Sequence, residues 1–161
     1  MSVNANDFKN ALKLWASGVT VVTAQSAQEG PKGMTATSFA SVSMEPAQVL
    51  VCLNQATDTG ALVLEQQHFA INILNAEQQT VSNEFAGGSN QEQRFANVDW
   101  ETGQNGSPLL SAALVSIECK LVQQVIAGTH WVIIAEVEKV ICRTGEPLLY
   151  YHSSYRQLAE V

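Results

Sequence analysis

The stretch Gly33-Met-Thr-Ala-Thr-Ser-Phe-Ala-Ser-Val-Ser43 is the most informative part of this chain. It carries five hydroxyl side chains, from Thr35, Thr37, Ser38, Ser41 and Ser43. Each hydroxyl can donate and accept a hydrogen bond, and the Thr, Phe and Val content favours a strand. No lysine or arginine occurs between Lys32 and Arg94, so an anion bound here would be held by hydroxyl and backbone N–H groups, with any cation supplied from elsewhere. The stretch predicts either an uncharged anion cradle or a half-exposed strand whose Ser and Thr side chains face water.

Length and composition predict one domain over residues 1–161. The 161 residues, 46% of them hydrophobic, suffice for a single sizeable core. The net charge is −7 and the eight basic residues are scattered, which argues against nucleic acid or an anionic membrane as a partner. No segment approaches the ~20 apolar residues of a membrane span, and the N-terminus lacks a signal-peptide pattern. We therefore expect a cytoplasmic protein that binds neither nucleic acid nor membrane.

The cysteines, the histidines and the absence of common catalytic motifs limit the kinds of reaction that we expect from this chain. Cys52, Cys119 and Cys142 lie far apart in apolar runs, which predicts buried free thiols in a reducing compartment. The three histidines are also far apart in the sequence, so no metal site is predicted. The common dinucleotide, phosphate-loop, zinc-protease and serine-hydrolase motifs are absent. Chemistry supplied by a bound cofactor remains open.

Local patterns predict a hairpin that leads into the hydroxyl-rich stretch. An amphipathic helix is expected first, with Asn6 as its N-cap and Gly18 at its end, on the spacing of Phe8, Ala11, Leu12 and Trp15. The β-branched run 19–24 predicts a strand, and 25–33 predicts the turn that follows it.

Further strands are predicted along the rest of the chain, at 49–53, 69–74, 115–121, 130–142 and 147–151. In the third of these, Ser116, Glu118 and Lys120 alternate with apolar residues, which predicts one wet face. Short helices are expected at 60–65 and around Val81 and Phe85, the latter capped by Asn75 with Gln78 and ended by Gly87 and Gly88, while 89–107 is expected to be a long surface loop. The pattern predicts a mostly β fold, a Greek-key barrel with a few peripheral helices.

Several sequence blocks in order carry a family resemblance. They are residues 33–43, 49–54 with Thr59, 69–74, 83–88 with Arg94-Phe95, 128–130 and 148–151. Together they resemble the short-chain flavin reductase family over about Phe8 to Tyr155. Within that family the chain is most similar to the small reductase components of two-component monooxygenases, of the 4-hydroxyphenylacetate and pyrimidine-degradation types.

The resemblance implies a split-barrel homodimer that binds FMN or FAD, reduces it with NAD(P)H and passes diffusible reduced flavin to a monooxygenase. It places the flavin against Thr35, Ala36, Thr37, Ser38, Ser41, Val42, Asn54, Thr59, Phe85, Arg94 and Tyr155. Asn54 and Thr59 fall near the ribityl phosphate. Hydride transfer from nicotinamide to flavin is carried out by the cofactors, so the absence of a nucleophile motif is no obstacle.

The resemblance links His130 to the nicotinamide. His130 is the last residue of Gly128-Thr-His130, where many members have Gly-Asp-His. The neutral Thr129 hydroxyl would orient His130 or raise its basicity more weakly than Asp does, and a strand-end histidine held for structural reasons is the alternative. NADH is expected over NADPH, because a 2′-phosphate usually requires Arg or Lys and this chain is acidic.

Two other functions fit parts of the pattern. A non-catalytic flavin- or ligand-binding split barrel would share the hydroxyl cradle but would need no nicotinamide position. An oxidase of the pyridoxamine-phosphate type would place several Arg and Lys at its phosphate, and the gap between Lys32 and Arg94 argues against it.

Overall fold

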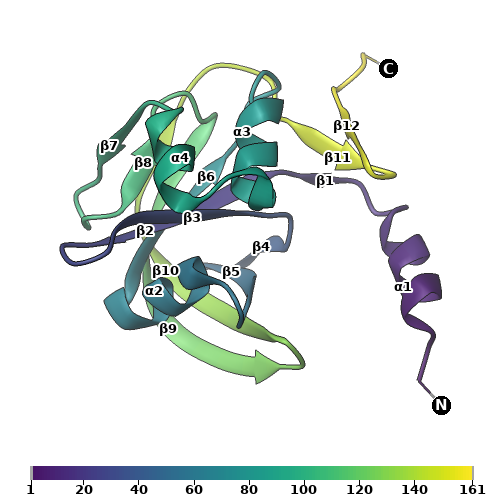
Figure 1. Ribbon diagram of the computed structural model, residues 1–161, viewed down its shortest axis with the longest axis horizontal. Helices are drawn as coiled ribbons and strands as arrows, with labels where there is room; N and C mark the ends of the chain where they lie inside the picture. Colours follow the sequence, from purple (N-terminus) through teal and green to yellow (C-terminus); the bar gives the residue numbers. More distant parts are fainter. Residues whose placement is uncertain (1, 161) are drawn as a thin grey trace.

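The computed structural model describes residues 2–160 and consists mainly of antiparallel strands (Figure 1). Seven strands form the main sheet in the spatial order β3-β2-β6-β9-β10-β5-β4. Their bounds are β2 Thr20–Ser26, β3 Gly30–Ala36, β4 Phe39–Met44, β5 Ala47–Asn54, β6 His68–Ile73, β9 Val115–Ala127 and β10 His130–Cys142. All neighbouring pairs are antiparallel, so the predicted mostly β class is confirmed.

The main sheet closes on itself as an open barrel. Strands β3 and β4 lie at its two opposite edges, yet only Thr37 and Ser38 separate them in the chain. A link of this length spans at most about 10 Å, so the two edges must come together. Ser38 immediately precedes β4 and is hydrogen-bonded to β5, because the Cys52 N–H donates to the Ser38 carbonyl at 3.3 Å. The predicted split barrel is confirmed, and the hydroxyl-rich stretch forms two strands rather than one.

Two apolar clusters form the core. The first contains Val22, Leu53, Phe69, Ile71 and Ile133 of the sheet, and helix α2 (Asp58–Gln66) adds Leu62 and Val63. The second contains Val19, Val21 and Leu74 with Phe85 and Phe95 from the helices above the sheet in Figure 1. Those helical segments are α3 (Gln79–Asn83), the π-helix η1 (Glu84–Gly88) and α4 (Gln91–Ala96). Each cluster joins strands to a helix that covers them.

Residues 89–107 do not form the predicted surface loop. They contain α4, whose N-terminus is a capping box of Asn90 and Gln93, and β7 (Trp100–Thr102), which pairs with β8 (Pro108–Leu110). Phe95 is buried, and its ring packs edge-on against Phe85 at 5.2 Å and Trp100 at 5.5 Å between centroids. The aromatic side chains anchor a segment whose other residues are polar.

The N-terminal helix α1 (Ala5–Leu12) stands apart from the barrel (Figure 1). Asn4 caps it by accepting from the Asn6 N–H at 2.8 Å, so the prediction of Asn6 as N-cap was wrong by two residues. It ends at Leu12, and Gly18 lies instead in β1 (Ser17–Gly18). Strand β1 pairs with β11 (Leu149–Tyr151), which pairs with β12 (Ser154–Arg156). No residue of α1 is buried.

The predicted cap of the helix around Val81 and Phe85 is displaced. Asn75 and Gln78 do bond to each other, with the Asn75 N–H donating to Gln78 Oε1 at 2.9 Å. However, α3 begins at Gln79 without a side-chain cap. The predicted end at the glycines is confirmed, since η1 ends at Gly88 and Gly87 has a φ of 116°.

The predicted wet face of residues 115–121 is wrong for Ser116 and Glu118, which are buried, and right for Lys120. Ser116 faces a polar network inside the fold. Glu118 lies under the β7–β8 turn, where its Oε2 accepts from the Asn105 N–H at 2.7 Å. Buried polar groups of this kind require hydrogen-bond partners, which Ser116 has in Asn72 and Glu118 has at Oε2, while Glu118 Oε1 has none among the described residues.

The cysteines were predicted to be buried, and this holds only for Cys119. Cys52 is half-buried and Cys142 is exposed, because each lies on an outward position of its strand. Desolvation, followed by the nearby Glu138 and Glu118 carboxylates, raises the pKa of the Cys119 thiol to about 12. Cys119 is therefore a neutral thiol at neutral pH.

Asn72 is the centre of the buried polar network. Its Nδ2 donates to the Val21 carbonyl at 3.2 Å and to Thr23 Oγ1 at 3.1 Å. Its Oδ1 accepts from the Leu110 N–H at 3.0 Å and from Ser116 Oγ at 3.1 Å. One amide thus uses all four of its hydrogen-bonding positions to join β2, β8 and β9 through β6.

We expect Asn72→Ala to lower the free energy of unfolding by about 2–4 kcal/mol, because it leaves several buried polar groups without a partner. Urea denaturation measures this difference. Asn10→Ala, on the exposed face of α1, is the matched control and should change stability by less than about 0.5 kcal/mol. Equal losses in the two variants would contradict the role of the network.

Candidate functional site

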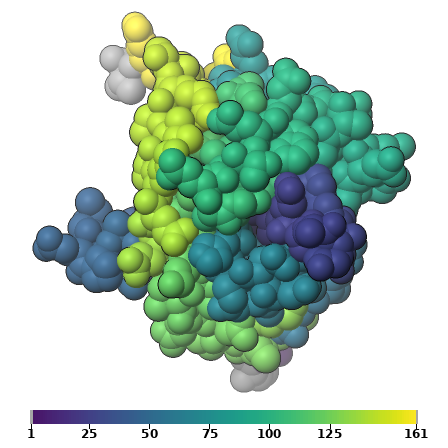
Figure 2. Space-filling model, turned by 90° about the vertical axis from the view of Figure 1, so that its left-hand side faces the viewer, coloured from purple at the N-terminus to yellow at the C-terminus, as the bar shows by residue number. Residues whose placement is uncertain are grey.

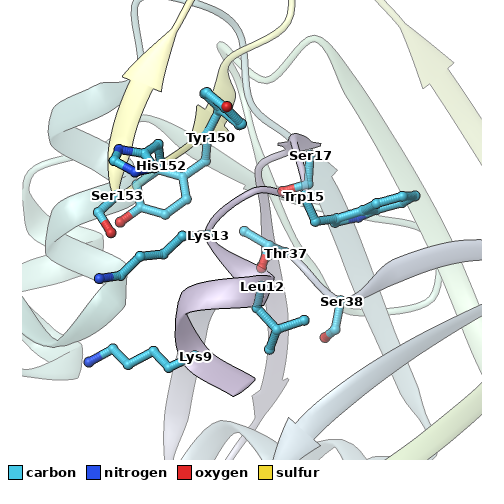
Figure 3. Close-up of a pocket in the computed structure, with 11 residues that line it drawn as sticks. Lys9, Leu12, Lys13, Trp15, Ser17, Thr37, Ser38, Tyr150, His152 and Ser153 are labelled. Atoms are coloured by element: carbon cyan, nitrogen blue, oxygen red, sulfur yellow. The ribbon is translucent and has the colours of Figure 1, made fainter. Parts of the chain in front are cut away.

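Three adjoining cavities form a continuous depression that we call the trough. The anion end, of about 310 Å³, is lined by Thr35, Thr59, Phe85 and Arg94 among others. The middle, of about 330 Å³, shares Thr35 with the anion end and adds Tyr155. The helix end, of about 470 Å³, shares Thr37 with the middle and reaches α1 (Figure 3). The hydroxyl-rich stretch therefore runs along all three.

The anion end is formed where α2 begins. Thr57 caps this helix, and its Oγ1 accepts from the Gly60 N–H at 3.2 Å. Uncapped N–H groups at a helix N-terminus attract negative charge. Thr59 lies on the floor, where its Oγ1 accepts from Gln91 Nε2 at 3.3 Å. Gln91 Oε1 in turn accepts from the Gly33 N–H at 2.9 Å, so α4 fixes the floor to β3.

Arg94 supplies the cation that the hydroxyl-rich stretch lacks. Its Nε donates to the Ser89 carbonyl at 2.9 Å and its Nη1 to the Gly33 carbonyl at 2.7 Å. No partner within residues 2–160 engages Nη2, which leaves one side of the guanidinium available. Burial lowers the pKa of Arg94 while the Asp58 carboxylate raises it, and the group stays charged at neutral pH. Asp58 lines the same cavity and partly offsets this charge.

The floor of the anion end depends on a glycine. A Cβ at Gly33 would lie 2.6 Å from Phe85 Cε1, so only glycine lets the Phe85 ring sit against β3. Phe85 belongs to the π-helix η1, and such segments often occur at functional sites. Its ring is buried and supports the cavity wall without exposing a flat face.

The middle of the trough is held by hydrogen bonds between distant segments. Thr35 Oγ1 donates to the Ser82 carbonyl at 2.7 Å, which ties β3 to α3. The Tyr155 hydroxyl lies 2.9 Å from Ser82 Oγ and 2.7 Å from Asn83 Oδ1, which ties β12 to the same helix. The Thr35 hydroxyl is thus committed to the protein, although it retains acceptor capacity.

Thr37 and Ser38 form the link between the two sheet edges and line the helix end. Ser38 Oγ donates to the Cys52 carbonyl at 2.9 Å and accepts from the Cys52 N–H at 3.2 Å. Thr37 is exposed and its hydroxyl makes no hydrogen bond to the described residues. Thr37 therefore offers the freest hydroxyl of the link.

The trough brings together most, but not all, of the residues predicted from the sequence. It is lined by Thr35, Thr37, Ser38, Thr59, Phe85, Arg94 and Tyr155. Ala36 is buried, while Ser41 and Val42 lie on the edge strand β4. Asn54 shapes the loop before α2, where its Oδ1 accepts from the Ala56 N–H at 2.9 Å. Ala36, Ser41, Val42 and Asn54 therefore do not line the trough.

His130 also lies outside the trough, at the first position of β10. It pairs with Asn54 of β5 and with Ala127 of β9. The Thr129 hydroxyl is 2.9 Å from its Nδ1, so Thr129 does fix the ring. Gln55 joins this turn to the start of α2, since its N–H donates to the Thr129 carbonyl at 3.0 Å. His130 is half-buried and its ring is oriented by protein groups.

Sequence analysis missed several residues of the trough. Asp58, Gln91, Ser82, Lys9 and Lys13 line or support it. Thr57-Asp58 before an apolar run is a helix-start signal that would have pointed to the anion end. No local pattern distinguishes the two lysines, because only the fold brings α1 beside Thr37.

Other kinds of site find no support in the described residues. Within residues 2–160, no group of three or more His, Cys, Asp or Glu side chains could hold a metal ion. No helix in the same range is long and apolar enough to cross a membrane.

Comparison with known proteins identifies relatives over nearly the whole chain. Residues 12–159 match the family described as flavin reductase like domain. FMN reductase (NADH) SmoA of Agrobacterium fabrum is 38% identical over 91% of this chain and 82% of its own length. The reductase component of an FADH(2)-dependent resorcinol hydroxylase from Rhizobium sp. is 36% identical over 92% of this chain and 84% of its own.

Solved structures agree with these relatives. Flavin reductase PheA2 superposes with a TM-score of 0.89 at 34% identity, over 98% of this chain and 100% of its own. The NADH:FAD oxidoreductase SgcE6 of Streptomyces globisporus, in complex with NAD and FAD fragments, has a TM-score of 0.89 at 30% identity, over 99% of this chain and 97% of its own.

We expect Gly33→Ala to lower the free energy of unfolding by about 1–3 kcal/mol, because the added methyl group overlaps the Phe85 ring. Urea denaturation tests this. Gly18→Ala is the control, since a Cβ there meets nothing within 4 Å. If both variants are equally stable, the Phe85 ring is not fixed against β3.

Proposed function

Since this chain belongs to the flavin reductase-like family, we propose that it is an NADH-dependent flavin reductase whose diffusible reduced flavin serves a separate monooxygenase. The trough is the observation that carries this proposal. It combines an anion end, with a helix N-terminus and Arg94, and a middle that is lined by hydroxyl groups and by the rings of Tyr150 and Tyr155. This order of groups fits a flavin, which has a phosphate at one end and a planar ring at the other.

The flavin phosphate, of FMN or of FAD, fits the anion end. Arg94 and the N-terminus of α2 would hold it there, with Thr59 beneath. The ring would then extend along Thr35, Thr37 and Ser38 toward the middle of the trough. Ala36, Ser41, Val42 and Asn54 stay assigned to the flavin site through the family resemblance alone.

The protein's task is binding and orientation. When bound, nicotinamide and flavin supply the hydride transfer themselves. The Thr37 hydroxyl, which lines both the middle and the helix end, would donate toward a ring edge that gains negative charge on reduction. Phe85 is buried beside the anion end, where it supports β3 next to the proposed phosphate position.

Steady-state kinetics test the proposed function. Purified protein should oxidise NADH only when FMN, FAD or riboflavin is added, and kcat/KM should be lower for NADPH. NADPH carries an additional phosphate, and this acidic chain has only eight basic residues to meet it. Flavin binding without NADH oxidation would show a non-catalytic flavin-binding barrel instead.

The anion end predicts discrimination between FMN and riboflavin. Arg94→Gln should raise the Kd for FMN roughly tenfold to a hundredfold, because it removes a charge-assisted contact, and leave riboflavin unchanged. Asp58→Asn should lower the Kd for FMN several-fold, because it removes a negative charge from the same cavity. Flavin fluorescence quenching measures both.

Glu65→Gln is the control for Asp58→Asn, since it removes an exposed carboxylate from the opposite end of α2. Its Kd for FMN should equal that of the wild type. A parallel change for riboflavin and FMN in the Arg94 variant would place the phosphate elsewhere.

His130 is assigned to the nicotinamide. The support is the family resemblance and an imidazole held in place by Thr129 beside the start of α2. In a single chain it lies outside the trough, at the start of β10.

We expect His130→Ala to raise KM for NADH with little change in kcat, because a contact made equally in ground and transition states changes binding alone. Thr129→Val should shift KM in the same direction but less, since it removes only the orienting hydroxyl. An unchanged KM for NADH in His130→Ala would remove the histidine from the nicotinamide site.

A homodimer is the proposed assembly. Large apolar side chains are exposed on α1 and just after it, and along the second half of β9, namely Phe8, Leu12, Trp15, Val122, Val125 and Ile126. The β4–β5 turn also projects from the body (Figure 2). The exposed side chains of Val42 and Met44 belong to β4, which leads into this turn. Such patches are typical of subunit contacts.

Light scattering should report about twice the 17.4 kDa of one chain. Ile126→Glu, which places a charge in the hairpin patch, should shift the mass toward that of one chain. Leu158→Glu, at an exposed position of the C-terminal tail, is the control and should leave the mass unchanged. A fully active single chain would refute the dimer.

A cytoplasmic location completes the proposal. Its support is the three free thiols, Cys52, Cys119 and Cys142, none of which is in a disulfide.

A further inference from the structure

The hydroxyl of Thr59, at the anion end of the trough, takes part in one hydrogen bond whose direction is fixed. Thr59 belongs to the first turn of α2, is buried and lines the cavity. Its Oγ1 lies 3.3 Å from Gln91 Nε2, and the amide nitrogen of a glutamine can only donate. Thr59 Oγ1 is therefore the acceptor in this bond. Its own proton is left for another acceptor.

The orientation of the Gln91 amide is set by the edge of the main sheet. Strand β3 is an edge strand, and its sheet partner β2 lies on one side only. On the open side, the Gly33 N–H donates to Gln91 Oε1 at 2.9 Å, and the Gly33 carbonyl accepts from Arg94 Nη1 at 2.7 Å. Two side chains of α4, three positions apart on one face of the helix, thus take the place of a neighbouring strand. Helices α4 and α2 both contact β3 and lie on either side of it in Figure 1.

The contact with Gly33 excludes the flipped orientation of the Gln91 amide. A backbone N–H can only donate, so an amide nitrogen that faced Gly33 would place two donors against each other. Oε1 therefore has to face Gly33, and Nε2 has to face Thr59. The direction of the bond between Gln91 and Thr59 follows from a backbone group that cannot change its role.

The Thr59 hydroxyl donates to no acceptor within residues 2–160, and this leaves its proton for a ligand in the cavity. Asp58 is the carboxylate that lines the same cavity, and among the described residues it accepts no hydrogen bond from Thr59. Arg94 lines the cavity too and can only donate. A phosphate oxygen, which carries negative charge and lone pairs but needs to donate nothing, suits two donors placed in this way.

We propose that Gln91 is a positioning residue for the flavin phosphate: by donating to Thr59 Oγ1, it makes the Thr59 hydroxyl a donor to the phosphate. This inference rests on the proposed function, because the phosphate is that of the proposed flavin. Gln91 and Thr59 then act as one unit that favours FMN over riboflavin. Arg94 favours FMN separately, through its charge.

A double-mutant cycle on the whole protein tests this role, with the Kd for FMN measured by flavin fluorescence quenching. Thr59→Val removes the hydroxyl and keeps the shape of the side chain, so it should raise the Kd for FMN roughly tenfold and leave riboflavin unchanged. Thr59→Ser should retain FMN binding. In Gln91→Glu, at about pH 8, the ionised carboxylate accepts from both the Gly33 N–H and the Thr59 hydroxyl, which turns the hydroxyl away from the phosphate. In that background Thr59→Val should change the Kd for FMN by less than about twofold.

The cycle separates the orientation of the hydroxyl from the effect of added charge. The charge of Gln91→Glu weakens FMN binding with and without the Thr59 hydroxyl, so it cancels in the comparison. Gln93→Glu is the matched control, because it adds the same charge to α4 at an exposed position and can still accept from the Asn90 N–H. There, Thr59→Val should still raise the Kd for FMN roughly tenfold. If urea denaturation shows that Gln91→Glu does not fold, Gln91→Met replaces it, and Thr59→Val should then raise the Kd less than in the wild type because the hydroxyl rotates freely.

An equal effect of Thr59→Val in the wild type and in the Gln91 variant would overturn the inference. A parallel loss of riboflavin binding, or a wild-type protein that binds no FMN, would overturn it as well. The outcome is separable from the proposed function, because the cycle measures binding alone. A Thr59 effect that depends on Gln91, in a protein that fails to oxidise NADH with any flavin, would support the positioning role and refute the reductase. Independent effects in an active reductase would do the reverse.

Discussion

The two-residue link between β3 and β4 is the constraint on which the rest of the structure depends. Because Thr37 and Ser38 alone connect strands at opposite edges of a seven-stranded sheet, the sheet has to curl until those edges meet. The bonds between Ser38 and Cys52 hold the junction closed on the β5 side. Closure buries the first core cluster and leaves the junction itself at the surface. The trough follows this junction, so the element that closes the barrel also lines the proposed site.

Much of this could be predicted from the sequence, and the failures have physical causes. The β-branched run 19–24 predicted the hairpin β2–β3, because local preferences and burial agree there. The predicted turn over 25–33 was too long, since Gly30 and Pro31 already pair with Ser26 and Gln25. Ser116 and Glu118 were assigned to water because alternation reports polarity and not partners. Asn72 and Asn105 bury them by supplying hydrogen bonds from β6 and from the β7–β8 turn. Such partners come from distant parts of the chain and leave no local pattern.

The residues of the candidate site also divide into those that a local sequence pattern predicts and those that depend on distant parts of the chain. Thr35 and Thr37 were predicted because several hydroxyl side chains within the short stretch 33–43 are unusual. Asp58 and Gln91 were missed, since each acts only after α2 and α4 have been placed beside β3. His130 illustrates the converse, because a sequence resemblance selects it while the geometry of one chain keeps it outside the trough.

The electrostatics of the anion end bear on how tightly the proposed flavin phosphate would be held. Arg94 donates through Nε and Nη1 to the Ser89 and Gly33 carbonyls. Only part of its guanidinium group is therefore available to bind a phosphate. Asp58 adds a negative charge to the same cavity, which weakens the attraction further. A site built for permanent retention would engage the phosphate with a full bidentate fork and no competing carboxylate. Under the proposed function reduced flavin passes to another protein, and an incomplete Arg94 fork beside a carboxylate is consistent with such release.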